Sequence, residues 1–200
     1  MNRSPDRTED AALADVRRRQ ILDAAADVFA RRGFHAASMA EIARSFGMSA
    51  GHIYNWFDSK EAIIEALVER DMANFTAFVS AARDAQDPRP LLLQQADQRA
   101  NELLDPARAA LQVEILAEAS RNPKIAAIVR RADATVRQGL GELLAKPLQL
   151  CCKPPELAAR IELLMSVFEG LLVRAVRHPE LDREAYRRLL GEAVAQVLRT

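Results

Sequence analysis

Three helix-start signals fall within residues 38–64, and this crowding constrains the fold more than any other feature of the chain. Each signal is a side chain that can accept a hydrogen bond from the backbone N–H groups of a first helical turn. The signals are Ser38 with Glu41, Ser49, and Asp58 with Glu61. Gly47 lies between the first two, and glycine tolerates the positive φ that ends a helix. The stretch therefore predicts two short helices, joined by a tight turn, ahead of a long one.

Helical patterns continue along the rest of the chain. Residues 16–32 carry apolar side chains at helical spacing, and Gly33 follows as a C-terminal cap. Three later helices begin where a capping side chain precedes a proline, because the missing N–H of proline costs nothing at the first helical position. They are expected at residues 88–104, 106–120 and 123–146. Two final helices carry apolar stripes around Leu171 and Leu190. We therefore expect an all-α protein of about nine helices.

Composition and charge exclude several classes of protein. The 28 basic and 28 acidic residues cancel, so any argument for nucleic acid must come from local residues. No apolar run reaches the roughly 20 residues of a membrane span, and the polar start lacks the apolar core of a signal peptide. A cytoplasmic protein with no membrane contact is expected. The sequence offers no paired carboxylates, activated nucleophile, phosphate-binding glycine loop or zinc-ligand spacing, so an enzyme, a metal site and a cofactor are not expected.

Two short helices around a glycine turn form the pattern of a helix-turn-helix. Such a pair needs an apolar inner face, which is supplied by Ile42, Ala43, Phe46, Ile53 and Phe57. Small or hydrogen-bonding residues on the outer side of the second helix can reach base edges in a major groove. These residues are Ala50, Gly51, His52 and Asn55. Ser38, Tyr54 and Lys60 suit the DNA backbone through a hydroxyl, a helix N-terminus or a charge. Trp56 can serve either backbone contact or packing.

Residues from about 18 to 72 resemble the DNA-binding domain of the tetracycline-repressor (TetR) family. The resemblance is carried by the run ILDAAADVFARRGFHAASMAEIARSFGMSAGHIYNWFDSKEAIIEAL, in which Tyr54, Phe57 and Lys60 match the family's aromatic-lysine pattern. It implies a homodimeric transcriptional repressor that binds a palindromic operator in double-stranded DNA. It also implies release from the operator when an unknown small-molecule effector binds the C-terminal domain.

The C-terminal part resembles the family more loosely, through residues 114–125 and 168–176. By analogy the two C-terminal helices pair with their copies in a homodimer, and their wide apolar stripes agree with this independently. We expect a flexible tail at 1–15, a helix-turn-helix DNA-binding domain at 16–62, and a ligand-binding and dimerisation domain at 63–200.

Candidate ligand-binding residues in the last domain lie on helices that can face inward. They are Phe75, Phe78, Met165 and Phe168, with Arg99, Gln112, Glu118 and Arg121 as polar candidates. The apolar four can equally be plain core, and Glu118 can pair with Arg121 three residues later.

The sequence is also compatible with two different modes of regulation. A regulator of the same fold can act as an activator. The adjacent Cys151 and Cys152 can make the chain a thiol-responsive sensor, although burial as small apolar residues explains them as well. The basic run at 17–19 can contact DNA backbone or form a solvated face.

Overall fold

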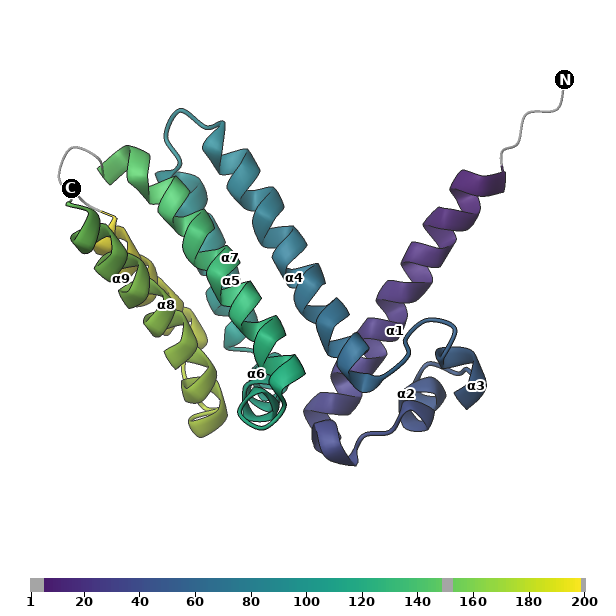
Figure 1. Cartoon of the computed structure of the whole chain (residues 1–200). Helices are drawn as coiled ribbons and strands as arrows, with labels where there is room; N and C mark the ends of the chain where they lie inside the picture. Colours follow the sequence, from purple (N-terminus) through teal and green to yellow (C-terminus); the bar gives the residue numbers. More distant parts are fainter. Residues whose placement is uncertain (1–5, 149–152, 199–200) are drawn as a thin grey trace, which may run out of the picture. The chain divides into compact units, whose positions relative to one another are not determined.

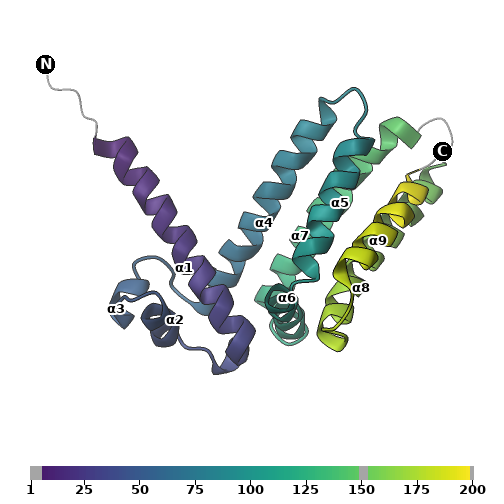
Figure 2. The same cartoon turned by 180° about the vertical axis from the view of Figure 1, so that it is seen from behind.

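The computed structural model describes residues 6–148 and 153–198, and every regular element in that part of the chain is a helix. The nine helices are α1 (Asp6–Ala36), α2 (Met39–Ser45), α3 (Ala50–Ile53), α4 (Lys60–Arg83), α5 (Arg89–Leu103), α6 (Pro106–Ala119), α7 (Pro123–Leu148), α8 (Pro154–Arg177) and α9 (Arg183–Val197). Figures 1 and 2 show them from opposite sides. The expected all-α fold is confirmed.

The chain forms two compact units, Met1–Leu67 and Val68–Thr200. Helix α4 (Lys60–Arg83) is continuous through the division, so it contributes residues to both units. The finer division at residues 15 and 62 stays a prediction. Cys151 and Cys152 lie outside the described residues.

Helix α1 begins at Asp6, well before the predicted start at residue 16. The periodicity gave no signal there because residues 11–20 are all exposed and have no inward-facing apolar stripe. Gly33 interrupts the helical geometry where the stop was predicted, with a φ of 75° and a ψ of 161°, although α1 continues past this kink to Ala36. Phe34 then turns into the core of the first unit, where its ring lies 5.7 Å from that of Phe29.

The caps of the two short helices differ from each other. Ser38 caps α2 as predicted, because its hydroxyl accepts a hydrogen bond from the backbone N–H of Glu41 at 3.1 Å. Ser49 precedes α3, but its side chain makes no capping hydrogen bond. Helix α3 ends at Ile53, whereas the sequence predicted a helix extending to Phe57.

The start of α4 is capped by a neighbour of the predicted residue. We expected Asp58 to cap this helix, but the hydroxyl of Ser59 accepts from the backbone N–H of Ala62 at 3.2 Å. The helix accordingly begins at Lys60. Both side chains can cap, so the sequence pattern alone did not separate them.

In the second unit, α5 packs on α8 and α9, while α6 and α7 pack on each other and on α8. Helices α8 and α9 run alongside each other in both views (Figures 1 and 2). The core that the helices of the second unit share is aliphatic, and it includes Leu103, Leu144, Leu171 and Val194. Two of the three predicted caps before prolines are confirmed, because the side chains of Asp105 and Asn122 accept backbone hydrogen bonds at 3.0 and 3.1 Å. The third prediction is wrong by one residue: α5 begins at Arg89, and Pro88 takes the N-cap position that was expected for Asp87.

Gly139 allows a close contact between α7 and α4 in the second unit. A Cβ atom added there would lie 2.7 Å from Cε1 of Phe75 and 2.9 Å from Cγ2 of Val79. Any larger residue would therefore push the aromatic side chain out of place. Among the described residues, none of the helices combines the length and the apolar character that crossing a bilayer requires.

Candidate nucleic-acid interface

The inner face of the helix-turn-helix is closed as predicted. Ile42, Ala43, Ile53 and Phe57 are buried, and Phe46 is half-buried. The turn between α2 and α3 uses Gly47 with a φ of 74°, which is the left-handed conformation that glycine adopts most easily. Burial of these apolar side chains holds the two short helices at one fixed angle. Neither helix is long enough to be stable alone.

The candidates for reading bases form an exposed surface on α3 and the turn that follows it. Ala50, Gly51, His52 and Asn55 are all exposed. Only the first three lie within α3, because Asn55 follows the helix end at Ile53. A Cβ atom added to Gly51 would meet nothing within 4 Å, so the packing of the protein does not require glycine at this position. The space above α3 is therefore open to a partner.

Ser38 and Tyr54 are both accessible to solvent, as a contact with the DNA backbone requires. Ser38 is exposed at the N-terminus of α2, although its hydroxyl already accepts the capping hydrogen bond. A hydroxyl can still donate to a phosphate oxygen while it accepts. Tyr54 is 53% exposed at the C-terminal cap of α3. Both residues keep a free approach from solvent.

Lys60 is engaged inside the first unit. Its Nζ donates hydrogen bonds to the backbone carbonyls of Phe34, of Ala37 at 2.8 Å and of His35 at 3.4 Å. It also lies 4.5 Å from the centre of the Phe34 ring, in a cation–π contact. These carbonyls belong to the last turn of α1 and to the residue that follows it. At the end of a helix, such carbonyls have no N–H group of a next turn to accept from.

Trp56 is half-buried, and its indole nitrogen is fully buried. Among the described residues, this Nε1 has no hydrogen-bond acceptor. A buried N–H group cannot donate to a phosphate unless the side chain moves. The geometry therefore favours packing over backbone contact, the alternative that the sequence left open.

Two residues of the basic run at 17–19 pack on aromatic rings of the same unit. The guanidinium of Arg17 lies 5.9 Å from the ring centre of Phe46, and that of Arg18 lies 5.1 Å from that of Phe57. Both rings belong to the inner face of the helix-turn-helix, so these cations cover its edge.

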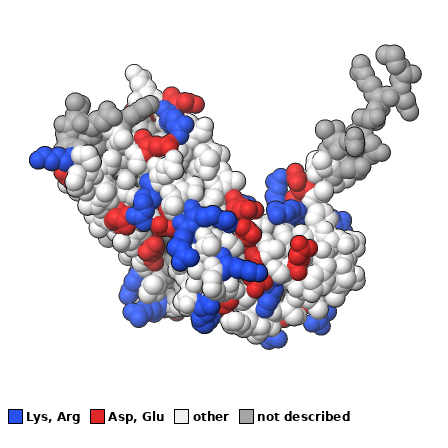
Figure 3. Space-filling view, viewed as in Figure 1, with Lys and Arg blue, Asp and Glu red and all other residues white. Residues whose placement is uncertain are grey.

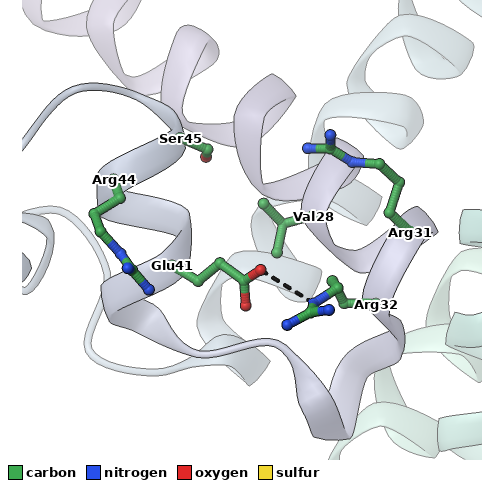
Figure 4. A pocket seen from close by; sticks show the side chains of 6 residues that line it. All are labelled: Val28, Arg31, Arg32, Glu41, Arg44 and Ser45. Atoms are coloured by element: carbon green, nitrogen blue, oxygen red, sulfur yellow. Dashed lines mark ion pairs between the residues drawn. The ribbon is translucent and has the colours of Figure 1, made fainter.

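A cavity of about 550 Å³ opens to solvent between α1 and α2. Its lining residues are Val28, Arg31, Arg32, Glu41, Arg44 and Ser45. Figure 4 shows the three guanidinium groups around the opening. The Nε of Arg32 lies 3.2 Å from Oε1 of Glu41, which joins the two helices by an ion pair. This cavity carries more positive than negative charge.

Sequence reasoning missed these arginines for a physical reason. Arg31 and Arg32 precede Gly33 and look like ordinary cations near the C-terminus of a helix. Arg44 is a single charge on α2. Only the folded unit brings the three together. On the face seen in Figure 3, basic and acidic side chains are interspersed.

The apolar ligand candidates lie on one side-chain cluster of the second unit. Phe75, Phe78, Met165 and Phe168 are partly buried against its aliphatic core. The ring centres of Phe75 and Phe78 are 6.2 Å apart.

The polar ligand candidates are less uniform. Glu118 is only 2% exposed, and it accepts hydrogen bonds from Arg121 at 3.5 Å and from Asn122 at 3.1 Å. The pairing of Glu118 with Arg121 is therefore present. Arg99 donates to Glu102 at 3.2 Å, and Gln112 is half-buried. Whether any of them binds a ligand stays a prediction.

Sequence comparisons identify the family. Residues 21–67 match the sequence model of "Bacterial regulatory proteins, tetR family", and residues 88–199 match that of "BetI-type transcriptional repressor, C-terminal". The transcriptional regulator UidR of Escherichia coli K12 is 30% identical over 174 residues, which cover 86% of this chain and 87% of UidR. The chain belongs to the TetR family. It is therefore a DNA-binding transcriptional regulator of the helix-turn-helix type, and it is not an enzyme.

Solved structures share the TetR fold over most of the chain. GusR of Salmonella enterica matches with a TM-score of 0.71 and 27% identity, over 92% of this chain and 95% of GusR. FadR of Bacillus subtilis, solved in complex with stearoyl-CoA, matches with a TM-score of 0.74 and 19% identity, over 88% of this chain and 96% of FadR. The transcriptional activator FasR of Mycolicibacterium smegmatis is 42% identical over 79 residues, 39% of this chain and 36% of FasR.

Proposed function

We propose that this TetR-family regulator is a cytoplasmic homodimeric repressor that binds a palindromic operator and is released by a small-molecule effector. The observation that carries the DNA-binding part is the exposed surface of Ala50, Gly51, His52 and Asn55 over a buried inner face. Small residues let the backbone of α3 approach the bases, while an imidazole and an amide can hydrogen-bond their edges. Ser38 and Tyr54 hold the DNA backbone in this proposal.

The proposal of a homodimer rests on exposed apolar side chains of the last two helices. They are Leu163, Val173 and Val176 on α8 and Leu189 on α9, and each is about half exposed. Large apolar side chains exposed on two neighbouring helices favour a partner surface, because contact with the partner removes their apolar area from water. A second copy supplies an identical pair of helices, and a palindromic operator matches the twofold axis between the copies.

The effector is proposed to bind in the second unit, among the aromatic residues Phe75, Phe78 and Phe168. FadR, which shares the fold, was solved with stearoyl-CoA, so this fold can hold a small molecule. Release requires the effector to bind the off-operator conformation more tightly, and about 1.4 kcal/mol of preference shifts the equilibrium tenfold. Helix α4 carries Phe75 and begins at Lys60, so it is the proposed link between effector and operator.

Selection of binding sites from a random duplex library tests the proposal and does not require that the operator sequence be known. The wild-type protein should enrich a palindrome with half-sites about one helical turn or more apart. Asn55→Ala should change the bases that are enriched, whereas Tyr54→Ala should weaken binding to all sequences alike. Failure to enrich any sequence would contradict the proposal.

Activation and thiol sensing are each open to a separate test. FasR is named an activator, and it is similar to 39% of this chain. Deletion of the gene separates repression from activation, since target expression rises if the protein represses and falls if it activates. For the thiol sensor, a double Cys151→Ser and Cys152→Ser variant should lose the response to oxidant. An unchanged response would exclude a sensor of this kind.

A further inference from the structure

We propose that the open cavity between α1 and α2 contacts the phosphate backbone of double-stranded DNA, beside the bases that α3 reads. This inference rests on the proposed function and adds a second contact surface to it. The charged groups that carry it are Arg31, Arg32 and Arg44, with Glu41 as the single carboxylate. Three cations and one anion leave an excess of positive charge in one concave surface.

Two of the three guanidinium groups have most of their donors available. The Nε of Arg31 donates to the carbonyl of Asp27 at 3.2 Å, and that of Arg44 donates to the carbonyl of Ala40 at 3.4 Å. Both contacts lie within the arginine's own helix, and among the described residues neither side chain has an ion pair. Arg32 alone is neutralised, by Glu41. The Nη groups of Arg31 and Arg44 can therefore bind an anion in a forked geometry.

Exposure favours a nucleic-acid backbone over a small enclosed anion. All three arginines are exposed, and the cavity opens directly to solvent. A metabolite site would surround its ligand and bury most of its surface. Ser38 is the N-cap of helix α2 and Arg44 lies in its last turn, so one short helix and its cap present two groups suited to phosphate. A chain of phosphates can reach both.

The test compares Arg31→Gln and Arg44→Gln with the wild-type protein on a random-sequence duplex, by fluorescence anisotropy across a salt series. Non-specific binding depends on phosphate contacts, so no operator is needed. Each variant should lower the slope of log K against log salt by about 0.9 for each protomer that contacts the duplex. Arg130→Gln is the matched control, because Arg130 is exposed on α7 in the second unit. It removes the same charge and should leave the slope unchanged.

The outcomes separate this inference from the proposed function. A wild-type protein without salt-dependent binding would contradict the proposed function itself. Wild-type binding with unchanged slopes for both cavity variants would overturn the cavity inference alone. Unchanged slopes, together with inorganic phosphate that stabilises the wild type but not the variants against heat, would assign the cavity to a small anion instead.

The contacts of Lys60 carry a second and independent inference. We infer that Lys60 is a positioning residue that holds the end of α1 and thereby orients the N-terminus of α2, and that it does not contact phosphate. An ammonium group has three N–H donors, and Lys60 has the carbonyls of Phe34, His35 and Ala37 as acceptors. Ala37 directly precedes Ser38, so the anchored carbonyls fix the backbone that leads to the capping serine.

Two substitutions at Lys60 test this role on the same random-sequence duplex. Lys60→Arg keeps the charge but replaces a compact ammonium with a planar fork, which cannot serve three converging carbonyls. If Lys60 is a positioning residue, Lys60→Arg should weaken binding several-fold and leave the salt slope unchanged. Lys60→Met should weaken binding further, again with an unchanged slope. If Lys60→Met does not fold, Lys60→Arg alone decides the question.

A double-mutant cycle with Ser38→Ala distinguishes positioning from a general effect on stability. If Lys60 acts through Ser38, the losses in affinity of Lys60→Arg and Ser38→Ala are not additive in the double variant. Circular dichroism confirms that each protein is folded during the measurement. Wild-type affinity for Lys60→Arg with a lower slope for Lys60→Met would show a phosphate contact and overturn the inference, as would additive losses in the cycle.

Discussion

Gly51 shows how function and folding make different demands on one residue. A Cβ atom at this position would meet nothing within the protein, and glycine costs a helix roughly 0.5–1 kcal/mol relative to alanine. Gly51→Ala should therefore leave the free energy of unfolding unchanged or raise it by up to about 1 kcal/mol. On DNA, the added methyl group should weaken binding by about fivefold or more, as overpacking costs about 1–3 kcal/mol. Chemical denaturation measures the change in the free energy of unfolding, and DNA titration measures the change in affinity. An unchanged affinity would contradict the proposed close approach of the α3 backbone to the bases.

Trp56 offers a second test at the same scale. Its buried N–H has no acceptor among the described residues, and an unsatisfied buried donor costs about 1–3 kcal/mol. Trp56→Phe removes this donor and keeps an aromatic ring. We expect stability equal to or above that of the wild type and an unchanged salt slope of DNA binding. A loss of slope would instead show that the indole contacts DNA backbone.

Residue types at helical spacing were enough to predict the buried inner face, because burial of Ile42, Ile53 and Phe57 follows from periodicity alone. The contacts of Lys60 were not predictable in this way. They depend on a turn of α1 more than twenty positions earlier in the chain, and a lysine at the start of a helix suggests an anion as readily as a carbonyl. The cavity arginines were missed because they come from two helices.

At the scale of helices, the sequence predicted where most begin and less well where they end. Prolines and capping side chains marked the starts of α6 and α7, since both signals are local. The length of α3 depends on packing against its neighbours, so the early end at Ile53 was not visible in the sequence.

The contact between α4 and α7 depends on Gly139. Gly139→Ala adds a methyl group 2.7 Å from a carbon atom of Phe75, which should cost about 1–3 kcal/mol and exceed the gain in helix propensity. Gly141→Ala is the matched control on the same helix, because its nearest neighbour, Ile161, is 3.8 Å away. Thermal unfolding should show a lower Tm for the first variant and an equal or higher Tm for the control. Equal shifts in both variants would refute the close packing.

Burial of Asp71 on α4 predicts a pH dependence of stability. Desolvation raises the pKa of this carboxyl above its usual 3.8, against the opposing charges of Arg99, Arg70 and Arg108. A raised pKa in the folded state means that protonation stabilises the fold, an effect complete below about 3.8 and lost as the pH rises through the higher value. Asp71→Asn should therefore be more stable than the wild type at neutral pH, because Arg99 keeps Glu102 as a partner.

The sign of this effect is checked by unfolding both proteins across a pH series. The advantage of Asp71→Asn should shrink as the pH falls and the wild-type carboxyl takes up its proton. A difference that grows towards acidic pH would mean that Asp71 stabilises the fold as a charged group.

At the scale of the whole molecule, the proposed homodimer makes a prediction about assembly. Leu163→Asp places a charge on the exposed apolar surface of α8, where it should disrupt a dimer without disturbing the monomer core. Val113→Asp is the control, since Val113 is also exposed but lies on α6. In analytical ultracentrifugation the wild type and the control should sediment as dimers and Leu163→Asp as a monomer. A monomeric wild-type protein would contradict the interface.

The central claim is that the exposed surface of α3 reads a palindromic operator, and footprinting on the DNA that flanks the protein's own gene tests it most directly. The wild-type protein should protect a palindromic segment, with two half-sites on one face of the duplex, and rising salt should weaken this protection steeply. Asn55→Ala should lose the protected segment at the same protein concentration. Flanks left unprotected by the wild type, with no salt-sensitive binding to any duplex, would contradict the account.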